Sequence, residues 1–148
     1  MFKPCDLGAV REYPAIVRDE LDTPRSLTYL HFQNVVDPTA MDFERSEFYL
    51  ADMLGSPTSG LVAVHSFDDW LAKSRSAREG RLDGCEKFSR IVYKKLRFRP
   101  GHRPSVDYFT LARLGTTVYI SARLKDAIVR SGITGLEIRP NKRLFADL

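Results

Sequence analysis

The pattern of apolar and polar positions in the first quarter of the chain predicts two strands. Residues 7–17 are weakly strand-like and are interrupted by Pro14. Residues 25–36 are richer in β-branched and aromatic side chains, which fall on both faces of an extended chain. Because both faces are largely apolar, residues 25–36 are predicted to form a central strand of a sheet.

Two stretches in the second half of the chain also predict strands. Residues 85–100 have the pattern of a strand with a strongly basic flank. Residues 105–120 predict two short strands that are joined near Leu114 and Gly115. Strand-forming segments therefore come from both halves of the chain.

A helix is predicted to follow the short apolar strand at residues 61–65. Ser66 stands where an N-cap is expected, and Asp69 lies three residues later, which is the spacing of a capping box. Apolar residues then recur at helical spacing until Gly80, which is expected to end the helix.

The stretch from Tyr119 to Pro140 predicts a strand, a capped helix, a glycine stop and a second strand. Ser121 is the expected N-cap, and Leu124 is expected to face the core. Gly132 is expected to adopt the left-handed conformation that ends the helix. The run that follows is predicted to be extended as far as Pro140.

Residues 38–57 are compatible with two structures. Four of them fall at the spacing of one helical face: Phe43, Glu47, Leu50 and Leu54. The run EFYLADM within this stretch would also serve as a strand. The helix is the favoured interpretation.

Together these elements predict one α+β domain over residues 1–148, with a mixed or mainly antiparallel sheet and about three helices. A chain of 148 residues fits one domain of ordinary size. No linker rich in glycine or serine divides it.

The composition is that of a globular protein without a membrane partner. No apolar run approaches the roughly 20 residues that a membrane span needs, and the first twenty residues contain no uninterrupted apolar segment of a signal peptide. A cytoplasmic location is therefore expected. Cys5 and Cys85 belong to no CxxC pair and are expected to be reduced thiols.

Charge is distributed unevenly along the chain. Residues 1–70 carry five basic and twelve acidic residues, whereas residues 71–148 carry eighteen and seven. If the two halves segregate in space, the protein has two faces of opposite sign. If strands from both halves interleave, the charges mix.

The residues that could carry catalysis or bind a metal form no recognisable motif. No histidine has a second histidine or a cysteine at metal-ligand spacing: His31, His65 and His102. Cys85 lies near Lys87, but no pattern ties it to a histidine. The chain is therefore expected not to be an enzyme, and to contain no catalytic residue, no metal and no cofactor.

A basic stretch at residues 87–103 is the strongest compositional feature. Seven lysines and arginines alternate there with aromatic residues, as they would in a surface that neutralises phosphates and stacks on bases. Four of them are the candidates for nucleic-acid binding: Lys94, Lys95, Arg97 and Arg99. The alternative is a solvated strand face, or one that pairs with the acidic half. A weaker signal is the spacing of Gly132 and Gly135, which resembles the GxxG loop of KH RNA-binding domains.

The segment VDYFTLARLGTTVYISARLKDAIVRSGITGLEIRP resembles the C-terminal signature of an immunity-protein family of bacterial polymorphic toxin systems, the one numbered eleven. The residues that match are Asp107, Ser121, Leu124, Gly132, Gly135 and Pro140. The resemblance covers about a quarter of the chain and does not reach residues 1–58. It implies a non-catalytic protein that binds and neutralises a cognate toxin by occluding the toxin's active site.

The acidic segment MDFERSEFYLADM lies outside this signature and is the expected toxin-binding surface. It combines carboxylates with aromatic side chains, as interface hot spots do. The expected partner-binding residues are Asp42, Phe43, Glu44, Glu47, Tyr49 and Asp52. The alternative is an amphipathic helix with an acidic, solvated face and a buried aromatic face.

Overall fold

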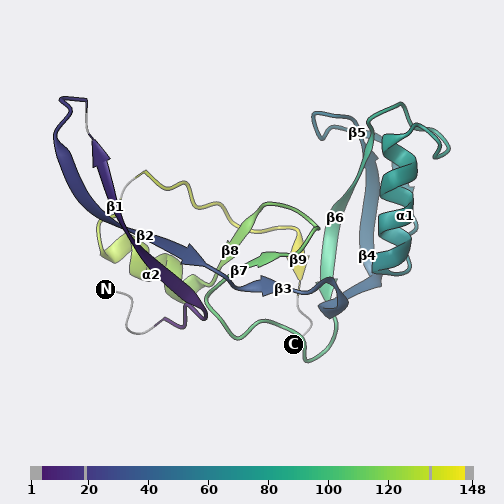
Figure 1. The fold of residues 1–148 in the computed structure, drawn as a ribbon. Coiled ribbons are helices and arrows are strands. Elements are labelled where there is room, and N and C mark those ends of the chain that lie inside the picture. Colours follow the sequence, from purple (N-terminus) through teal and green to yellow (C-terminus); the bar gives the residue numbers. More distant parts are fainter. Residues whose placement is uncertain (1–4, 19, 134, 146–148) are drawn as a thin grey trace. The chain divides into compact units, whose positions relative to one another are not determined.

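The computed structural model describes residues 5–18, 20–133 and 135–145 (Figure 1). Within these residues the chain forms two α-helices, one 3-10 turn and nine strands, most of which pair antiparallel. The predicted α+β class is therefore confirmed. Neither α-helix in the described residues has the length and apolar character needed to cross a membrane.

The chain divides into two compact units, each built from two segments. Unit 1 consists of Met1–Val36 and Pro104–Ile138, and unit 2 consists of Asp37–Arg103 and Arg139–Leu148. By sequence, unit 1 carries eight basic and eight acidic residues, whereas unit 2 carries fifteen and eleven. The acidic and basic halves of the chain are thus mixed within the units, as expected if their segments interleave.

Unit 1 contains two small sheets and one helix. Strands β1 (Val10–Arg18) and β2 (Pro24–Phe32) pair antiparallel as a hairpin. The second sheet has the order β3-β7-β8, with β3 parallel and β8 antiparallel to β7. Its strands, and the helix that follows them, are β3 (Val35–Val36), β7 (Tyr108–Leu111), β8 (Val118–Ile120) and α2 (Ala122–Arg130).

Unit 2 contains a four-stranded sheet of order β5-β4-β6-β9 and one helix. The strands are β4 (Met41–Ala51), β5 (Pro57–Val62), β6 (Arg90–Phe98) and β9 (Leu144–Phe145). Helix α1 (Phe67–Arg78) contacts β6, and a 3-10 turn η1 (Pro38–Ala40) precedes β4. In the described part of this sheet, β9 pairs parallel and the other strands pair antiparallel.

The helix predicted over residues 38–57 is wrong, because this stretch forms η1 and the central strand β4. β4 pairs with β5 on one side and with β6 on the other, so its backbone is satisfied across the sheet. The pairing with β6 is irregular between Asp42 and Phe48, and this irregularity places Phe43 and Phe48 together in the core although five positions separate them. That odd spacing breaks the regular alternation of a strand. The described residues therefore hold two α-helices instead of about three.

Two strand predictions are also corrected. Residues 25–36 were expected to be a central strand, but among the described residues β2 pairs with β1 alone, and its side chains up to His31 are exposed. The expected strand between Gly132 and Pro140 does not form in the described residues. Gly135 has a φ of 80°, which turns the chain, and the extended pairing comes later, at β9.

Both predicted helix caps are confirmed. The Ser66 hydroxyl accepts a hydrogen bond from the Asp69 amide at 3.1 Å, and the Ser121 hydroxyl accepts one from the Leu124 amide at 3.0 Å. The capping box differs in one detail, since the Asp69 carboxylate accepts from the amide of His65 at 2.9 Å. Each cap satisfies an amide that the first helical turn leaves without a backbone partner.

The end caps of α2 give a first prediction about stability. Ser121→Ala should lower the free energy of unfolding by about 1 kcal/mol, because the Leu124 amide loses its acceptor. Gly132→Val should cost about 1–2 kcal/mol, because a branched side chain disfavours a φ of 68°. Open space surrounds the Gly132 Cβ position, so Gly132→Asn, which tolerates this conformation, is the matched control and should cost less. Urea denaturation followed by circular dichroism measures all three, and an equal cost for valine and asparagine would contradict the backbone explanation.

Candidate functional site: the open face of the unit 2 sheet

One face of the unit 2 sheet is filled by aromatic packing. Phe43 and Phe48 of β4 stack at 5.8 Å between ring centroids. Phe43 also contacts Phe67 of α1 at 6.3 Å, and Phe67 stacks on Trp70 at 5.8 Å. These contacts join the sheet to the helix through a continuous apolar layer, and they stabilise the strands from behind.

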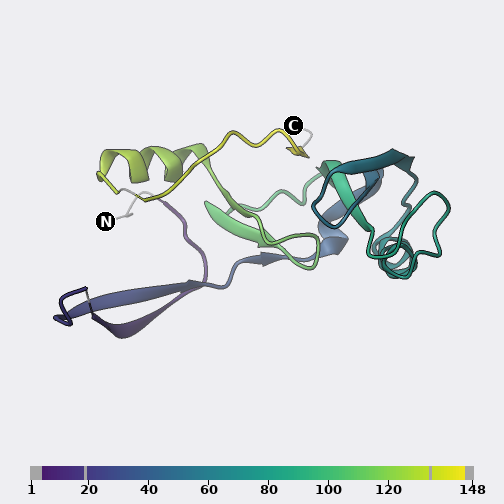
Figure 2. The same ribbon diagram turned by 90° about the horizontal axis from the view of Figure 1, so that it is seen from above.

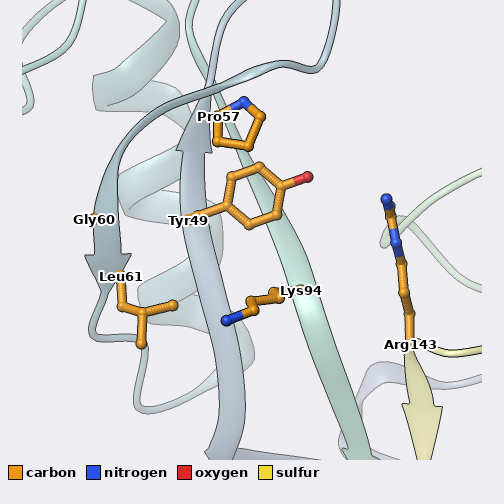
Figure 3. Close-up of a pocket in the computed structure, with 6 residues that line it drawn as sticks. All are labelled: Tyr49, Pro57, Gly60, Leu61, Lys94 and Arg143. Atoms are coloured by element: carbon orange, nitrogen blue, oxygen red, sulfur yellow. The ribbon is translucent and has the colours of Figure 1, made fainter.

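The opposite face of the same sheet carries a shallow hollow of about 460 Å³ (Figure 3). It is lined by Tyr49, Pro57, Gly60, Leu61, Lys94 and Arg143. Tyr49 and Leu61 are cross-strand partners on β4 and β5, and the Leu61 side chain is 63% exposed. Figure 3 shows Lys94 between these apolar residues and Arg143, with the strands in front of α1. The hollow thus has an apolar floor and a cationic side, and we call it the open face.

Glu47 holds two lysines at the border of the open face. Its carboxylate lies 2.7 Å from the Lys95 ammonium group and 3.5 Å from that of Lys94. A bulge in the pairing of β4 with β6 sets both lysines against this one residue. The hydrogen bond from Lys95 lowers the pKa of the Glu47 carboxyl, against the opposing effect of burial, and the charges of both lysines act in the same direction.

The acidic and the basic stretches, which were considered as separate binding surfaces, therefore meet on adjacent strands. Besides the Glu47 cluster, Asp42 and Arg97 are opposite each other in the strand register. The Arg97 guanidinium lies 5.5 Å from the Phe145 ring, and the Arg99 side chain donates to the Met41 carbonyl at 3.2 Å. Much of the basic stretch thus takes part in holding the sheet together.

The expected partner-binding residues divide into three groups. Phe43 is buried in the core at 4% exposure, so it packs against α1 and is not offered to a partner. Asp42 and Asp52 accept backbone hydrogen bonds, from Arg45 and from both Leu54 and Ser56 respectively. Tyr49 lies in the open face and Glu47 at its border, and the Glu44 side chain is exposed.

Sequence reasoning missed several residues of the open face. Leu61 was expected only as part of a short strand, although the neighbouring Gly60, which has no side chain to cover it, was a usable signal. Arg143 had no local signal, because its position depends on the parallel pairing of β9 with β6 across about fifty residues. Leu96 donates its amide to the Arg143 carbonyl at 2.6 Å, and this bond places Arg143 beside the sheet.

A second polar cluster lies in unit 1 around Asp107, which is 4% exposed. Its carboxylate accepts from the Asp6 amide at 2.6 Å, from the Arg123 Nε at 3.1 Å and from the Ser121 hydroxyl. The Arg123 hydrogen bond is the main cause that lowers the pKa of Asp107, and burial opposes it. Three residues of the signature, Asp107, Ser121 and Leu124, therefore meet as a cap and an anchor for the N-terminal segment.

Among the described residues, the remaining candidate groups form no further site. Cys5 and Cys85 are free thiols, and the Cys85 sulfur lies 3.7 Å from the Ala77 carbonyl. In the part of the chain that the structure describes, no three histidine, cysteine or acidic side chains come together in a way that could hold a metal ion. The open face is therefore the surface whose geometry suits binding best.

Comparison of the chain with protein-family models, with curated proteins and with solved structures gave no match. The family resemblance of residues 106–140 accordingly stays a prediction from the sequence.

Proposed function

We propose that this protein is a cytoplasmic immunity protein that binds a cognate bacterial toxin and blocks the toxin's active site, without catalysing a reaction itself. The observation that carries the proposal is the open face. It offers an aromatic and an aliphatic side chain, Tyr49 and Leu61, on two adjacent strands, with the charged side chains of Lys94 and Arg143 beside them. Exposed apolar side chains next to charged ones are typical of a protein interface.

The toxin-binding surface that we propose differs from the one expected from the sequence. The acidic segment does not present its aromatic residues together, since Phe43 and Phe48 lie in the core. Tyr49 remains available, and its neighbours come from β5, β6 and the residue before β9. We therefore place the interface across the strands instead of along the acidic segment. The cationic side of the hollow, with Lys94 and Arg143, suits a toxin that presents carboxylates there.

Co-expression with the toxin encoded by the adjacent gene tests the proposed function. Cells that produce the toxin alone should stop growing, and cells that also produce this chain should survive. The purified proteins should elute as one complex, and the complex should have no toxin activity. Survival without a complex, or a complex that keeps full toxin activity, would contradict inhibition by occlusion.

Nucleic-acid binding through the basic stretch is the second candidate, and Glu47 provides a sharp test of it. Because Glu47 pairs with Lys94 and Lys95 and offsets one of their two charges, we expect weak binding to single-stranded RNA or DNA that vanishes near physiological ionic strength. Glu47→Gln should strengthen binding at low salt, since two lysines lose their partner. Changing Lys94, Lys95, Arg97 and Arg99 to Gln should remove it.

Fluorescence anisotropy with a labelled oligonucleotide measures these changes across a salt series. Glu44→Gln is the matched control, because Glu44 is exposed and its substitution removes the same charge from another position on β4. Submicromolar affinity at physiological salt for the unmodified chain would favour the nucleic-acid function over the toxin.

A further inference from the structure

The β1–β2 hairpin of unit 1 is an apolar arm with few neighbours. Figure 2 shows it leaving the three-stranded sheet of the same unit. Its base is held by Phe32, which stacks on Tyr108 of β7 at 4.1 Å. Beyond the base, Ile16 is 75% exposed, Leu27 54% and Tyr29 59%. A two-stranded hairpin with such a surface is marginally stable in water and gains from a further strand.

The two faces of the hairpin follow from its register. Tyr13 pairs with Tyr29, and their ring centroids lie 6.3 Å apart. Ala15 pairs with Leu27 on the same face, which makes an apolar strip along the middle of the arm. An added strand beside β2 would continue this strip.

The free edges of the two strands differ, and Pro14 is the cause. The Gln33 amide donates to the Ala9 carbonyl at 2.9 Å, so Ala9 and Gln33 form a hydrogen-bonded pair. Because such pairs alternate along an antiparallel ladder, Pro14 and Thr28 form a non-hydrogen-bonded pair. The nitrogen of Pro14 therefore faces the outer edge of β1, where it interrupts the row of donors.

The outer edge of β2 has no such interruption. By the same alternation the backbone groups of Ser26, Thr28 and Leu30 point away from β1. In the part of the chain that the structure describes, β2 pairs with no strand on that side. A row of unpaired amides and carbonyls next to apolar side chains is a template for strand addition.

We propose that a second copy of this chain occupies the β2 edge. Two β2 strands pair antiparallel about a two-fold axis at Thr28, so that Ser26 of one copy is opposite Leu30 of the other. This register brings the outward-facing residues of both copies into hydrogen-bonded pairs along all of β2. It also sets Leu27 beside Tyr29 of the second copy, which extends the apolar strip across a four-stranded sheet. The interface is self-complementary, as a two-fold dimer requires.

The area that the hairpin can bury sets the strength of this interface. Two half-exposed tyrosines and their aliphatic neighbours offer on the order of 500 Å² per copy, which is below the roughly 800 Å² of a standard interface. The dimer is therefore expected to be reversible and to depend on concentration.

Sedimentation velocity of the full chain tests the proposal. The sedimentation coefficient should rise from the monomer to the dimer value between about 1 and about 200 µM. Thr28→Lys and Thr28→Glu each put like charges opposite each other at the two-fold axis, so each variant alone should dimerise at least tenfold more weakly. An equimolar mixture of the two should recover the dimer, because lysine then faces glutamate.

Thr28→Val is the matched control and should dimerise like the unmodified chain, since it keeps the amide and adds no charge. Thr28 is exposed, and circular dichroism of each variant shows whether the hairpin substitution is tolerated. An unmodified chain that stays monomeric over the whole range would overturn the proposal. A charged variant that dimerises as well as the unmodified chain would also overturn it. A mixture of the two charged variants that stays monomeric would do the same, and would assign the β2 edge to another partner.

Discussion

Asp107→Ala is expected to destabilise unit 1 by on the order of 3 kcal/mol, more than either substitution at the ends of α2. The reason is the number of donors that converge on one buried carboxylate. Alanine leaves the Asp6 amide and the Ser121 hydroxyl without an acceptor, and it leaves Arg123 without its carboxylate partner. Urea denaturation followed by circular dichroism measures the loss. Hydrogen exchange at the Ser121 and Leu124 amides should speed up in the variant.

Asp126→Ala is the matched control for this substitution. Asp126 belongs to the exposed surface of α2, so its removal should change the free energy of unfolding by less than about 0.5 kcal/mol. Arg123→Gln should have an intermediate effect, because the guanidinium is half exposed and the carboxylate keeps its other donors. Equal stability of the Asp107 and Asp126 variants would show that the cluster does not anchor the N-terminal segment.

The contribution of the Asp107 carboxylate to the free energy of unfolding should depend on pH. The folded pKa of Asp107 is lowered, so its contribution to stability is complete above the unfolded pKa of about 4 and is lost as pH falls through the folded value. The stability difference between the unmodified chain and Asp107→Asn should therefore stay constant from neutral pH to about pH 5. It should shrink below about pH 4. A difference that grew with acidification would contradict the direction of the pKa shift.

The helix caps and the short strands around them could be predicted from the sequence because they depend on local chemistry. Ser66 and Ser121 accept hydrogen bonds from amides three residues later, which the spacing alone indicates. The two strands on either side of Leu114 and Gly115 are likewise set by a short turn. Such features need no information from distant residues.

For the residues of β4 a strand was the alternative and a helix was favoured, because the irregular pairing with β6 breaks the regular alternation of a strand. Phe43 and Phe48 both enter the core only because the backbone between them departs from regular alternation. The prediction for the hairpin strand β2 was wrong in the opposite sense, because it overestimated burial. Its two apolar faces indicated a buried strand, and in the structure they belong to an exposed arm.

The open face depends most on long-range pairing. Tyr49, Leu61 and Lys94 come from three different strands, and Arg143 joins them through a parallel pair formed with a distant segment. No short pattern in the sequence indicates that these residues meet. The signature residues are different, because Asp107 and Ser121 lie close enough in the chain for a strand–turn–strand unit to bring them together.

Leu61→Asp is expected to abolish toxin binding while the fold remains intact, and this effect should be the largest on function. Leu61 is exposed and lines the open face, so a carboxylate there costs little in the free protein. In a complex the same carboxylate would be buried without a partner, which costs several kilocalories per mole. Tyr49→Ala should weaken binding by about 30-fold, as expected for an aromatic hot spot worth about 2 kcal/mol.

Leu54→Asp is the matched control, because Leu54 is 89% exposed in unit 2 and does not line the open face. It should bind the toxin like the unmodified chain in a calorimetric or surface-based assay. Reversal of Glu44 to Lys should change only the association rate at low salt, since its charge is exposed and lies outside the hollow. If Leu61→Asp binds the toxin as tightly as Leu54→Asp does, the open face is not the interface. The change in association rate caused by Glu44→Lys would then distinguish the two other candidate surfaces. Slower association would indicate a basic toxin and favour the acidic residues of β4. Faster association would indicate an acidic toxin and favour the basic stretch of β6.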